Sequence, residues 1–222
     1  MKDGILLIDK PADMTSFGVV ARIRRVLSSS SYSLGKKVKV GHTGTLDPFA
    51  TGLMIIVIGN ECKNAEKYSK LDKIYEVVIK LGETSTTGDT EGEISKISDK
   101  KPTLSDIERI VENFVGEITQ RPPLYSAIKI GGQRAYKIAR EGKQVEMPER
   151  QVKIYGLEIL SYEYPDLKIR VHVSSGTYIR SLAEDIGKAL GTGAYCTELR
   201  RLSVGEWNVQ ESQKLIEFGI ID

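Results

Sequence analysis

Apolar residues along this chain of 222 residues recur with two spacings, one typical of β-strands and one typical of α-helices. Alternating or short continuous runs predict strands at residues 4–10, 74–81, 94–97, 151–162, 166–174 and 194–202. The strands at 151–162 and 166–174 are expected to pair antiparallel through Pro165. Helical spacing predicts helices that begin near Thr15 or Ser16, Gly59, Ser105, Arg134 and Ile179, and a short one at 212–218.

The helix predicted after residue 104 has the clearest start. Ser105 and Glu108 have the spacing of a capping box, in which two side chains satisfy the first free amides of a helix. Its apolar residues form one stripe, at Ile107, Ile110, Val111 and Phe114. The helix after Ser16 has a similar stripe, at Val19, Val20, Ile23, Val26 and Leu27. Residues 28–37 are polar and basic and predict a loop.

Composition limits the class of protein. Hydrophobic residues make up 40% and charged residues 28%, and no apolar run approaches the roughly 20 residues of a membrane span, so a soluble globular protein is expected. Residues 1–15 show no secretory signal, and a cytoplasmic location follows by default. Two cysteines, Cys62 and Cys196, and two histidines supply no zinc pattern, so no metal site is expected and both thiols should be reduced and partly buried.

Charge is unevenly distributed along the chain. The whole sequence carries 32 − 30 = +2, whereas residues 121–153 hold eight basic and three acidic residues, 8 − 3 = +5. Tyr125 and Tyr136 are interleaved with these cations. This combination suits a phosphate backbone with bases stacked nearby, although a charge run is more often ordinary solvated surface.

The stretch Gly41-His42-Thr43-Gly44-Thr45-Leu46-Asp47-Pro48-Phe49-Ala50-Thr51-Gly52 surrounds one carboxylate with glycines and a proline. Such a segment is typical of an ordered loop held in one shape. Two interpretations of Asp47 remain open from these residues. It can be the N-cap of a helix that has Pro48 at its first position, or it can be a carboxylate held for chemistry.

Arg180 lies in the first turn of the helix predicted from residue 179, off its apolar stripe. A cation is unfavourable there because the helix dipole places partial positive charge at this end. Either the guanidinium is solvated or a carboxylate partner offsets the cost.

Six motifs in order resemble the TruB family of bacterial tRNA pseudouridine-55 synthases. They are Leu7-Ile8-Asp9-Lys10-Pro11, the stretch Gly41 to Gly52, Lys73-Ile74-Tyr75, Pro123-Leu124-Tyr125-Ser126-Ala127-Ile128-Lys129, Gly176-Thr177-Tyr178-Ile179-Arg180 and Leu199-Arg200-Arg201-Leu202. They cover about the first 205 residues. The resemblance, and not the periodicity, favours Asp47 as a nucleophile over a helix cap.

The resemblance also implies roles for other residues. Asp47 is the catalytic aspartate, Tyr75 stacks on the target base and Arg180 pairs with the aspartate. Leu199 packs against the base from its apolar side, and His42 lies where the RNA loop is remodelled. Further substrate-binding residues are implied at Lys63, Tyr178, Lys129, Arg134 and Arg140, the last three on a flexible thumb at about residues 122–150.

The implied fold is α+β, a mixed and mainly antiparallel central sheet flanked by helices, with a central RNA-binding cleft. The implied reaction isomerises uridine 55 in the T stem-loop of tRNA, by base flipping and without a cofactor, in a monomer that needs no protein partner. Alternatives from the residues are a tRNA-binding folding helper and a pseudouridine synthase for another RNA. Asp13 departs from the family's usual glycine, and the catalytic domain is expected to span residues 1–222 without a C-terminal PUA domain.

Overall fold

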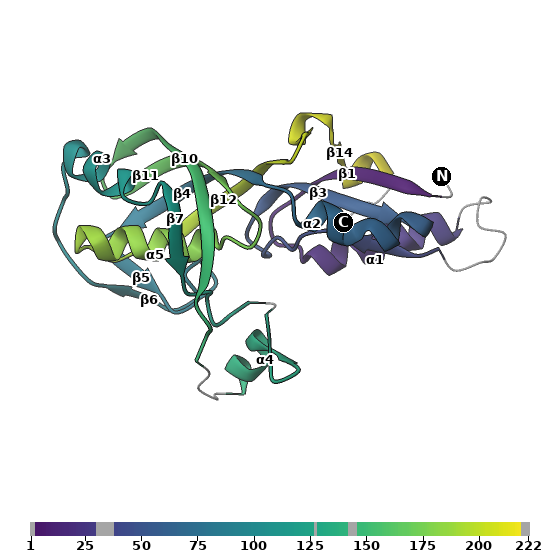
Figure 1. Cartoon of the computed structure of the whole chain (residues 1–222), viewed down its shortest axis with the longest axis horizontal. Helices are drawn as coiled ribbons and strands as arrows, with labels where there is room; N and C mark the ends of the chain where they lie inside the picture. The colour runs from purple at the N-terminus through teal and green to yellow at the C-terminus, as the bar shows by residue number, and fades with distance from the viewer. Residues whose placement is uncertain (1–2, 30–37, 127, 142–145, 219–222) are drawn as a thin grey trace. The chain divides into compact units, whose positions relative to one another are not determined.

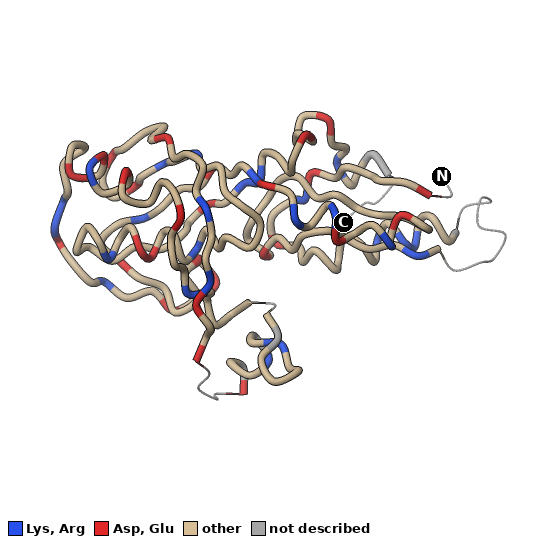
Figure 2. Tube along the Cα trace, in the orientation of Figure 1, with Lys and Arg blue, Asp and Glu red and all other residues tan. Residues whose placement is uncertain are grey.

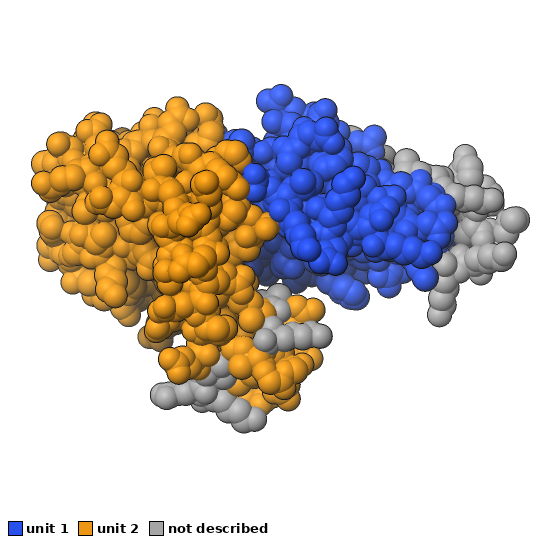
Figure 3. All heavy atoms as spheres, in the orientation of Figure 1, with its two compact units in different colours: residues 1–76, 199–222 blue, residues 77–198 orange. Residues whose placement is uncertain are grey.

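A computed structural model of the chain describes residues 3–29, 38–126, 128–141 and 146–218. It shows helices interspersed with a large mixed and mainly antiparallel sheet (Figure 1), so the predicted α+β class is confirmed. The chain forms two compact units, residues 1–76 with 199–222 (unit 1) and residues 77–198 (unit 2), coloured separately in Figure 3. Strands β4 (Lys73–Leu81) and β12 (Ala194–Val204) contribute residues to both units.

Unit 1 is built around strand β3 (Thr51–Ile58). Its neighbours in the sheet are β1 (Gly4–Lys10) and β2 (Val40–His42), both antiparallel, and β12, which is parallel. Strand β14 (Gln213–Lys214) pairs with β1, and β13 (Trp207–Asn208) pairs with β12. The remaining elements are α1 (Ser16–Ser29), α2 (Ala65–Ser69) and the short 3₁₀ helices η1 (Gly59–Asn64), η2 (Val209–Glu211) and η3 (Leu215–Phe218).

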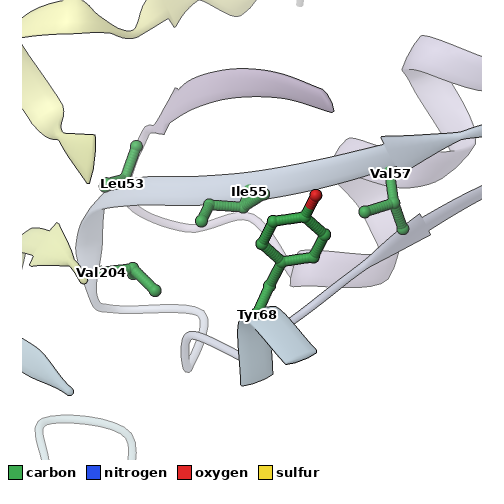
Figure 4. Packing of buried hydrophobic residues seen from close by; sticks show 5 residues of the cluster. All are labelled: Leu53, Ile55, Val57, Tyr68 and Val204. Carbon is green, nitrogen blue, oxygen red and sulfur yellow. The ribbon is translucent and has the colours of Figure 1, made fainter. Parts of the chain in front are cut away.

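The core of unit 1 follows from the unbroken apolar sequence of β3, whose residues after Thr51 are all buried. Figure 4 shows how Leu53, Ile55 and Val57 of this strand pack with Tyr68 and Val204. Full burial of side chains of this size stabilises by roughly 1.5–3 kcal/mol each. This strand therefore gives a firm base to the loop that precedes it.

Helix α1 begins where the sequence predicts. Of the two candidate caps, Thr15 takes the role, since its hydroxyl accepts a hydrogen bond of 2.9 Å from the Gly18 amide. Val19, Val20 and Ile23 are buried, which confirms the apolar stripe. The preceding turn contains Asp13, which adopts a positive φ of 59°. A glycine, which the resemblance implies at this position, would adopt this conformation without the strain that it imposes on most other residues.

Unit 2 contains a sheet with the strand order β4-β11-β10-β7. Strands β7 (Gly116–Gln120), β10 (Arg150–Glu163) and β11 (Asp166–Val173) are joined by antiparallel pairing, and β5 (Glu83–Ser85) and β6 (Ile94–Lys96) form a separate hairpin. The helices are α3 (Leu104–Glu112), α4 (Ala135–Arg140) and α5 (Ile179–Leu190). Between β7 and β10 the thumb contains α4 and the two-stranded β8 (Lys129–Ile130) and β9 (Gln133–Arg134).

Alternation in β11 and the helical stripe of α5 are both confirmed. Leu167, Ile169, Val171 and Val173 are buried, whereas the residues between them are more exposed. Helix α5 buries the predicted residues Ile179, Leu182, Ala183, Ile186 and Leu190. Unit 2 therefore has its own hydrophobic core.

The capping box predicted at Ser105 and Glu108 is wrong by two residues. The cap is Thr103, whose hydroxyl accepts from the Asp106 amide, while the Asp106 carboxylate accepts from the Thr103 amide at 3.0 Å. Thr103 and Asp106 have the same spacing as the predicted pair. Thr103 is in the extended conformation that a cap requires, whereas Ser105 already lies inside the helix.

The remaining predictions concern the two cysteines, membrane-spanning segments and the loop at residues 28–37. Both cysteines are free thiols, as predicted, and Cys62 is half-buried, whereas Cys196 is more buried than predicted. No helix in the described ranges is long and apolar enough to cross a membrane. Most of the predicted loop at 28–37 lies outside the described residues.

Candidate active site

Asp47 lies in the loop between β2 and β3 and is half-buried. The loop makes one tight turn, in which the Ala50 amide donates to the Asp47 carbonyl at 3.2 Å, and then enters β3 at Thr51. No helix begins at Asp47. The interpretation of Asp47 as a helix cap is therefore wrong, and its role in chemistry stays a prediction.

Three side chains from distant parts of the sequence fix the backbone on both sides of Asp47. The Ser16 hydroxyl donates to the Leu46 carbonyl at 2.9 Å and accepts from the Leu46 amide at 2.8 Å. The Lys10 ammonium donates to the Pro48 carbonyl at 3.0 Å, and Arg201 Nη2 donates to the Gly44 carbonyl at 3.2 Å. The residues just before and after Asp47 are thus both anchored.

Two buried cations, Lys10 and Arg201, bond to this loop, and a third, Lys73, is close enough to Arg201 to feel its charge. Lys10 and Arg201 are 0% and 2% exposed, and Lys73 is also buried. Burial, followed by the nearby charge of Arg201, lowers the pKa of Lys73 to about 8. Hydrogen bonds to carbonyl oxygens offset part of the cost of burying these charges, including those from Lys10 to Met14 and from Arg201 Nε to Leu53, both 2.7 Å. The bonds from Lys10 and Arg201 to carbonyl oxygens of the loop hold its backbone in place.

Gly52 is required where β3 passes β12. Its φ is +104°, and a Cβ atom on it would lie 2.3 Å from the Arg201 carbonyl oxygen. The two strands pair here in parallel, with Gly52 opposite Arg201. Next to it, Arg200 donates two hydrogen bonds to the Asp9 carboxylate, at 2.7 and 3.0 Å, which connects β12 to β1. These contacts account for the two arginines of the Leu199–Leu202 motif.

Arg180 has a carboxylate partner in unit 2. Its Nη1 lies 3.0 Å from Asp89 Oδ2, and the two side chains are 4% and 3% exposed. Nη1 also donates to the Thr87 carbonyl at 2.7 Å and Nη2 to the Tyr125 carbonyl at 2.8 Å. Asp89 accepts in turn from the Thr87 hydroxyl and the Glu91 amide. The cost of a cation in the first turn of α5 is therefore offset, which confirms that alternative.

Glu184 lies one helical turn beyond Arg180. Burial, together with the charges of Asp185 and Asp89, raises its pKa from 4.5 to about 7, although Arg180 opposes the shift. One of its oxygens lies 2.4 Å from where a Cβ on Gly88 would stand, so it lies beside the turn that carries Asp89. Glu184 therefore gains a proton near neutral pH beside the Arg180 ion pair.

This raised pKa predicts a pH-dependent stability. The folded protein binds the Glu184 proton more tightly than the unfolded chain, so the contribution of this group to the free energy of unfolding is lost as pH rises from about 4.5 through about 7. We expect Glu184→Gln to stabilise the protein more at pH 8 than at pH 5, as measured by denaturant unfolding. Glu112→Gln, at an exposed position on α3, is the control. An equal effect of Glu184→Gln at both values would contradict the assignment.

The other predicted site residues are placed as follows. Tyr75 on β4 and Leu199 on β12 are buried, each 7% exposed, and His42 at the end of β2 is half-buried. Lys63 in η1 and Arg134 in the thumb are exposed. Tyr178 is half-buried at the N-cap position of α5. The side chains of Lys129 and Arg140 lie outside the part of the chain that the structure describes.

The predicted residues divide between the two units. Asp47, Tyr75 and Leu199 belong to unit 1, and Arg180 and Tyr178 belong to unit 2. The pairing of Asp47 with Arg180 and the central cleft therefore stay predictions. Ser16 and Asp89 are not predicted as site residues from the sequence. Lys10 and Arg201 lie within the six motifs, but the sequence predicts no role for them.

Comparison with known proteins assigns the chain to a family. A model described as TruB family pseudouridylate synthase (N terminal domain) matches residues 32–179, and one described as tRNA pseudouridylate synthase B C-terminal domain matches residues 180–218. The chain belongs to the TruB family of pseudouridylate synthases. It is thus an isomerase of the pseudouridine synthase class, as predicted. The match to the first model includes the loop around Asp47.

The sequences of individual TruB relatives align with nearly the whole chain. The tRNA pseudouridine synthase B of Clostridium acetobutylicum is 44% identical over 206 residues, which cover 93% of this chain and 68% of the relative. That of Francisella tularensis subsp. novicida is 43% identical over 215 residues, covering 96% and 68%. Among solved structures, a Cbf5-Nop10-Gar1 complex matches with a TM-score of 0.72 and 30% identity over 97% of this chain. The chain spans about half of that matched protein, 53%.

Proposed function

We propose that this protein converts uridine to pseudouridine in tRNA, at position 55 of the T loop, with Asp47 as the catalytic carboxylate. The observation that carries the proposal is the anchored loop of unit 1, where Lys10, Ser16 and Arg201 hold the backbone around one half-buried aspartate. Relatives that are 41–44% identical are named tRNA pseudouridine synthase B, which supports tRNA as the substrate. Position 55 and the role of Asp47 are the finer parts of the proposal.

The reaction explains why a carboxylate has to be held rigidly. The N1–C1′ bond of uridine breaks, the uracil turns, and a C5–C1′ bond forms, while C5 loses a proton and N1 gains one. Asp47 can add to C6 of the base or to C1′ of the ribose. Either step requires the ionised carboxylate. Pairing with Arg180, which we propose in the RNA-bound enzyme, favours that form and stabilises charge that develops on the detached base.

Base recognition is assigned to apolar and aromatic side chains. The target uridine must leave the stack of the folded T loop before any group can reach it. We assign Tyr75 to stacking on the flipped base and Leu199 to its apolar side. Tyr178 lies two residues before Arg180 and is assigned to the same base, with His42 at the remodelled RNA loop. No cofactor takes part in this scheme.

Direct product mapping tests the function. The purified protein is incubated with an unmodified tRNA transcript, and pseudouridine is located by chemical mapping along the whole RNA. We expect a single product at position 55. Binding of the transcript without any product would favour the folding-helper alternative. If cells that lack the protein lose pseudouridine only from RNAs other than tRNA, the substrate is another RNA.

The thumb is proposed to bind the phosphate backbone, and Figure 2 shows Lys and Arg residues recurring around α4. Lys137 is exposed on this helix. We expect Lys137→Gln to reduce the slope of log binding constant against log salt by about 0.7–0.9, the value for one phosphate contact. Titration of a tRNA transcript at several salt concentrations measures the slope. Lys188 is an exposed lysine on α5, and Lys188→Gln should leave the slope unchanged. Equal slopes for both variants would show that Lys137 makes no phosphate contact.

A further inference from the structure

Gln120, the last residue of β7, has an unusual pair of hydrogen bonds. Its side-chain Oε1 accepts from the Tyr178 amide at 2.7 Å, and its Nε2 donates to the Tyr178 carbonyl at 2.9 Å. The residue is 0% exposed although it carries an amide. A carboxamide supplies a donor and an acceptor on neighbouring atoms, as a protonated carboxyl of the same length also does, whereas a carboxylate supplies acceptors alone. The two bonds fix the backbone of Tyr178, two residues before Arg180.

The strand opposite Gln120 holds the side chain of the same tyrosine. Arg150 at the start of β10 pairs in register with Gln120. Its guanidinium lies 5.5 Å from the centre of the Tyr178 ring, within the range of a cation–π interaction, and its Nη1 approaches the Gly176 carbonyl at 3.4 Å. Gln120 and Arg150 are the two residues at the base of the thumb. One holds the backbone of Tyr178, and the other lies over its ring.

Further bonds connect the entry of the thumb to the first turn of α5. The Ser181 hydroxyl donates to the Arg121 carbonyl at 2.9 Å, and Arg180 Nη2 donates to the Tyr125 carbonyl at 2.8 Å. The Arg121 side chain pairs with Glu149 at 2.9 Å, which joins the entry of the thumb to its exit. The residues before and after the thumb are therefore bonded to each other and to Tyr178, Arg180 and Ser181.

We propose that Gln120 is a positioning residue that couples the thumb to Tyr178 and Arg180. When RNA binds the thumb, the strand that enters it carries Gln120, and the bonds of Gln120 fix the turn of α5 that presents Tyr178 and the guanidinium. Arg150 completes this coupling by holding the tyrosine ring. The inference rests on the proposed function for its catalytic consequence, but the coupling itself is a property of unit 2.

Replacement by glutamate gives a test with its own rescue. Burial raises the pKa of a carboxyl group, so Gln120→Glu is protonated at low pH, where its hydroxyl can donate to the Tyr178 carbonyl and its other oxygen can accept from the amide. Relative to wild type at the same pH, we expect its single-turnover rate on saturating tRNA transcript to be about tenfold lower at pH 8.5 and within about threefold at pH 5.5. A ratio that stays constant between these values overturns the proposal.

Gln151→Glu is the matched control. Gln151 follows Arg150 on β10, is exposed, and its side-chain amide donates to the Thr119 hydroxyl and not to α5. We expect its rate ratio to be independent of pH. Circular dichroism and thermal melts at both pH values restrict the comparison to folded protein. Binding of the transcript should change less than the rate, since the proposal concerns the position of Tyr178 and Arg180 and not the number of RNA contacts.

Hydrogen exchange in the wild-type protein tests the coupling without any variant or product. Addition of a T stem-loop RNA should slow exchange of the amides at 124–126 and at 178–181 together. Protection of only one of these segments overturns the coupling, even if the Gln120 variants fold poorly. If the wild type binds RNA but forms no pseudouridine, the proposed function fails, and the exchange result still decides whether the thumb and α5 act together.

Discussion

Asp47→Asn is expected to reduce pseudouridine formation by at least about 10³-fold while RNA binding stays close to that of the wild type. The amide has nearly the same shape as the carboxylate, so the anchors from Lys10, Ser16 and Arg201 are kept. It cannot act as a nucleophile, and it lacks the negative charge that the proposed mechanism requires. The loss should therefore appear in the single-turnover rate at saturating RNA and not in the dissociation constant.

Asp13→Asn is a matched control for this variant. It makes the same chemical change at an exposed position of unit 1, and asparagine tolerates the positive φ of 59° found there. We expect wild-type rates from this protein. Substantial product from Asp47→Asn would contradict the role of Asp47, and loss of RNA binding by the same variant would indicate that the carboxylate supports the RNA site instead.

Removal of Asp89 is expected to have the largest effect on stability. Asp89→Ala leaves the guanidinium of Arg180 buried at 4% exposure and without the carboxylate that lies 3.0 Å away. Breaking a buried ion pair on one side typically destabilises by about 3–5 kcal/mol. Denaturant unfolding followed by circular dichroism measures the difference in the free energy of unfolding.

The pair Arg170–Glu158 is the natural control, since its charges are also 3.0 Å apart but its side chains are 42% and 61% exposed. Glu158→Ala should cost less than about 1 kcal/mol, the usual value for a surface pair. Equal losses from Asp89→Ala and Glu158→Ala would contradict the conclusion that burial determines the strength of the Arg180 pair. A stable Asp89→Ala protein would mean that the carbonyls of Thr87 and Tyr125 suffice for the guanidinium.

Sequence periodicity predicts the strands and helices well where one face is buried. The alternation around Ile169 and Val171 and the stripe of α5 are read directly from residue spacing, because burial acts on every second residue of a strand or every third to fourth of a helix. The residue at which α3 begins is harder to predict from the sequence. Thr103 and Ser105 both offer a suitable hydroxyl with an acid three residues later, and only the backbone conformation distinguishes them.

The candidate site is predicted only in part, for a different physical reason. Asp47 is identified by its motif, since glycine and proline constrain the chain locally. Asp89 and Gln120 are not, because their partners Arg180 and Tyr178 are 91 and 58 residues away in sequence. A polar side chain that will be buried by a distant segment looks like any surface residue until the fold brings its partner to it.

The discontinuity of unit 1 has a consequence for synthesis on the ribosome. Residues 77–198 are contiguous and can fold as soon as they emerge, whereas residues 1–76 need β12 beside β3 and β14 beside β1, both supplied by the last part of the chain. Domains generally fold as units during translation. The N-terminal strands, although made first, therefore lack two of their sheet neighbours until residues 199–214 have been synthesised.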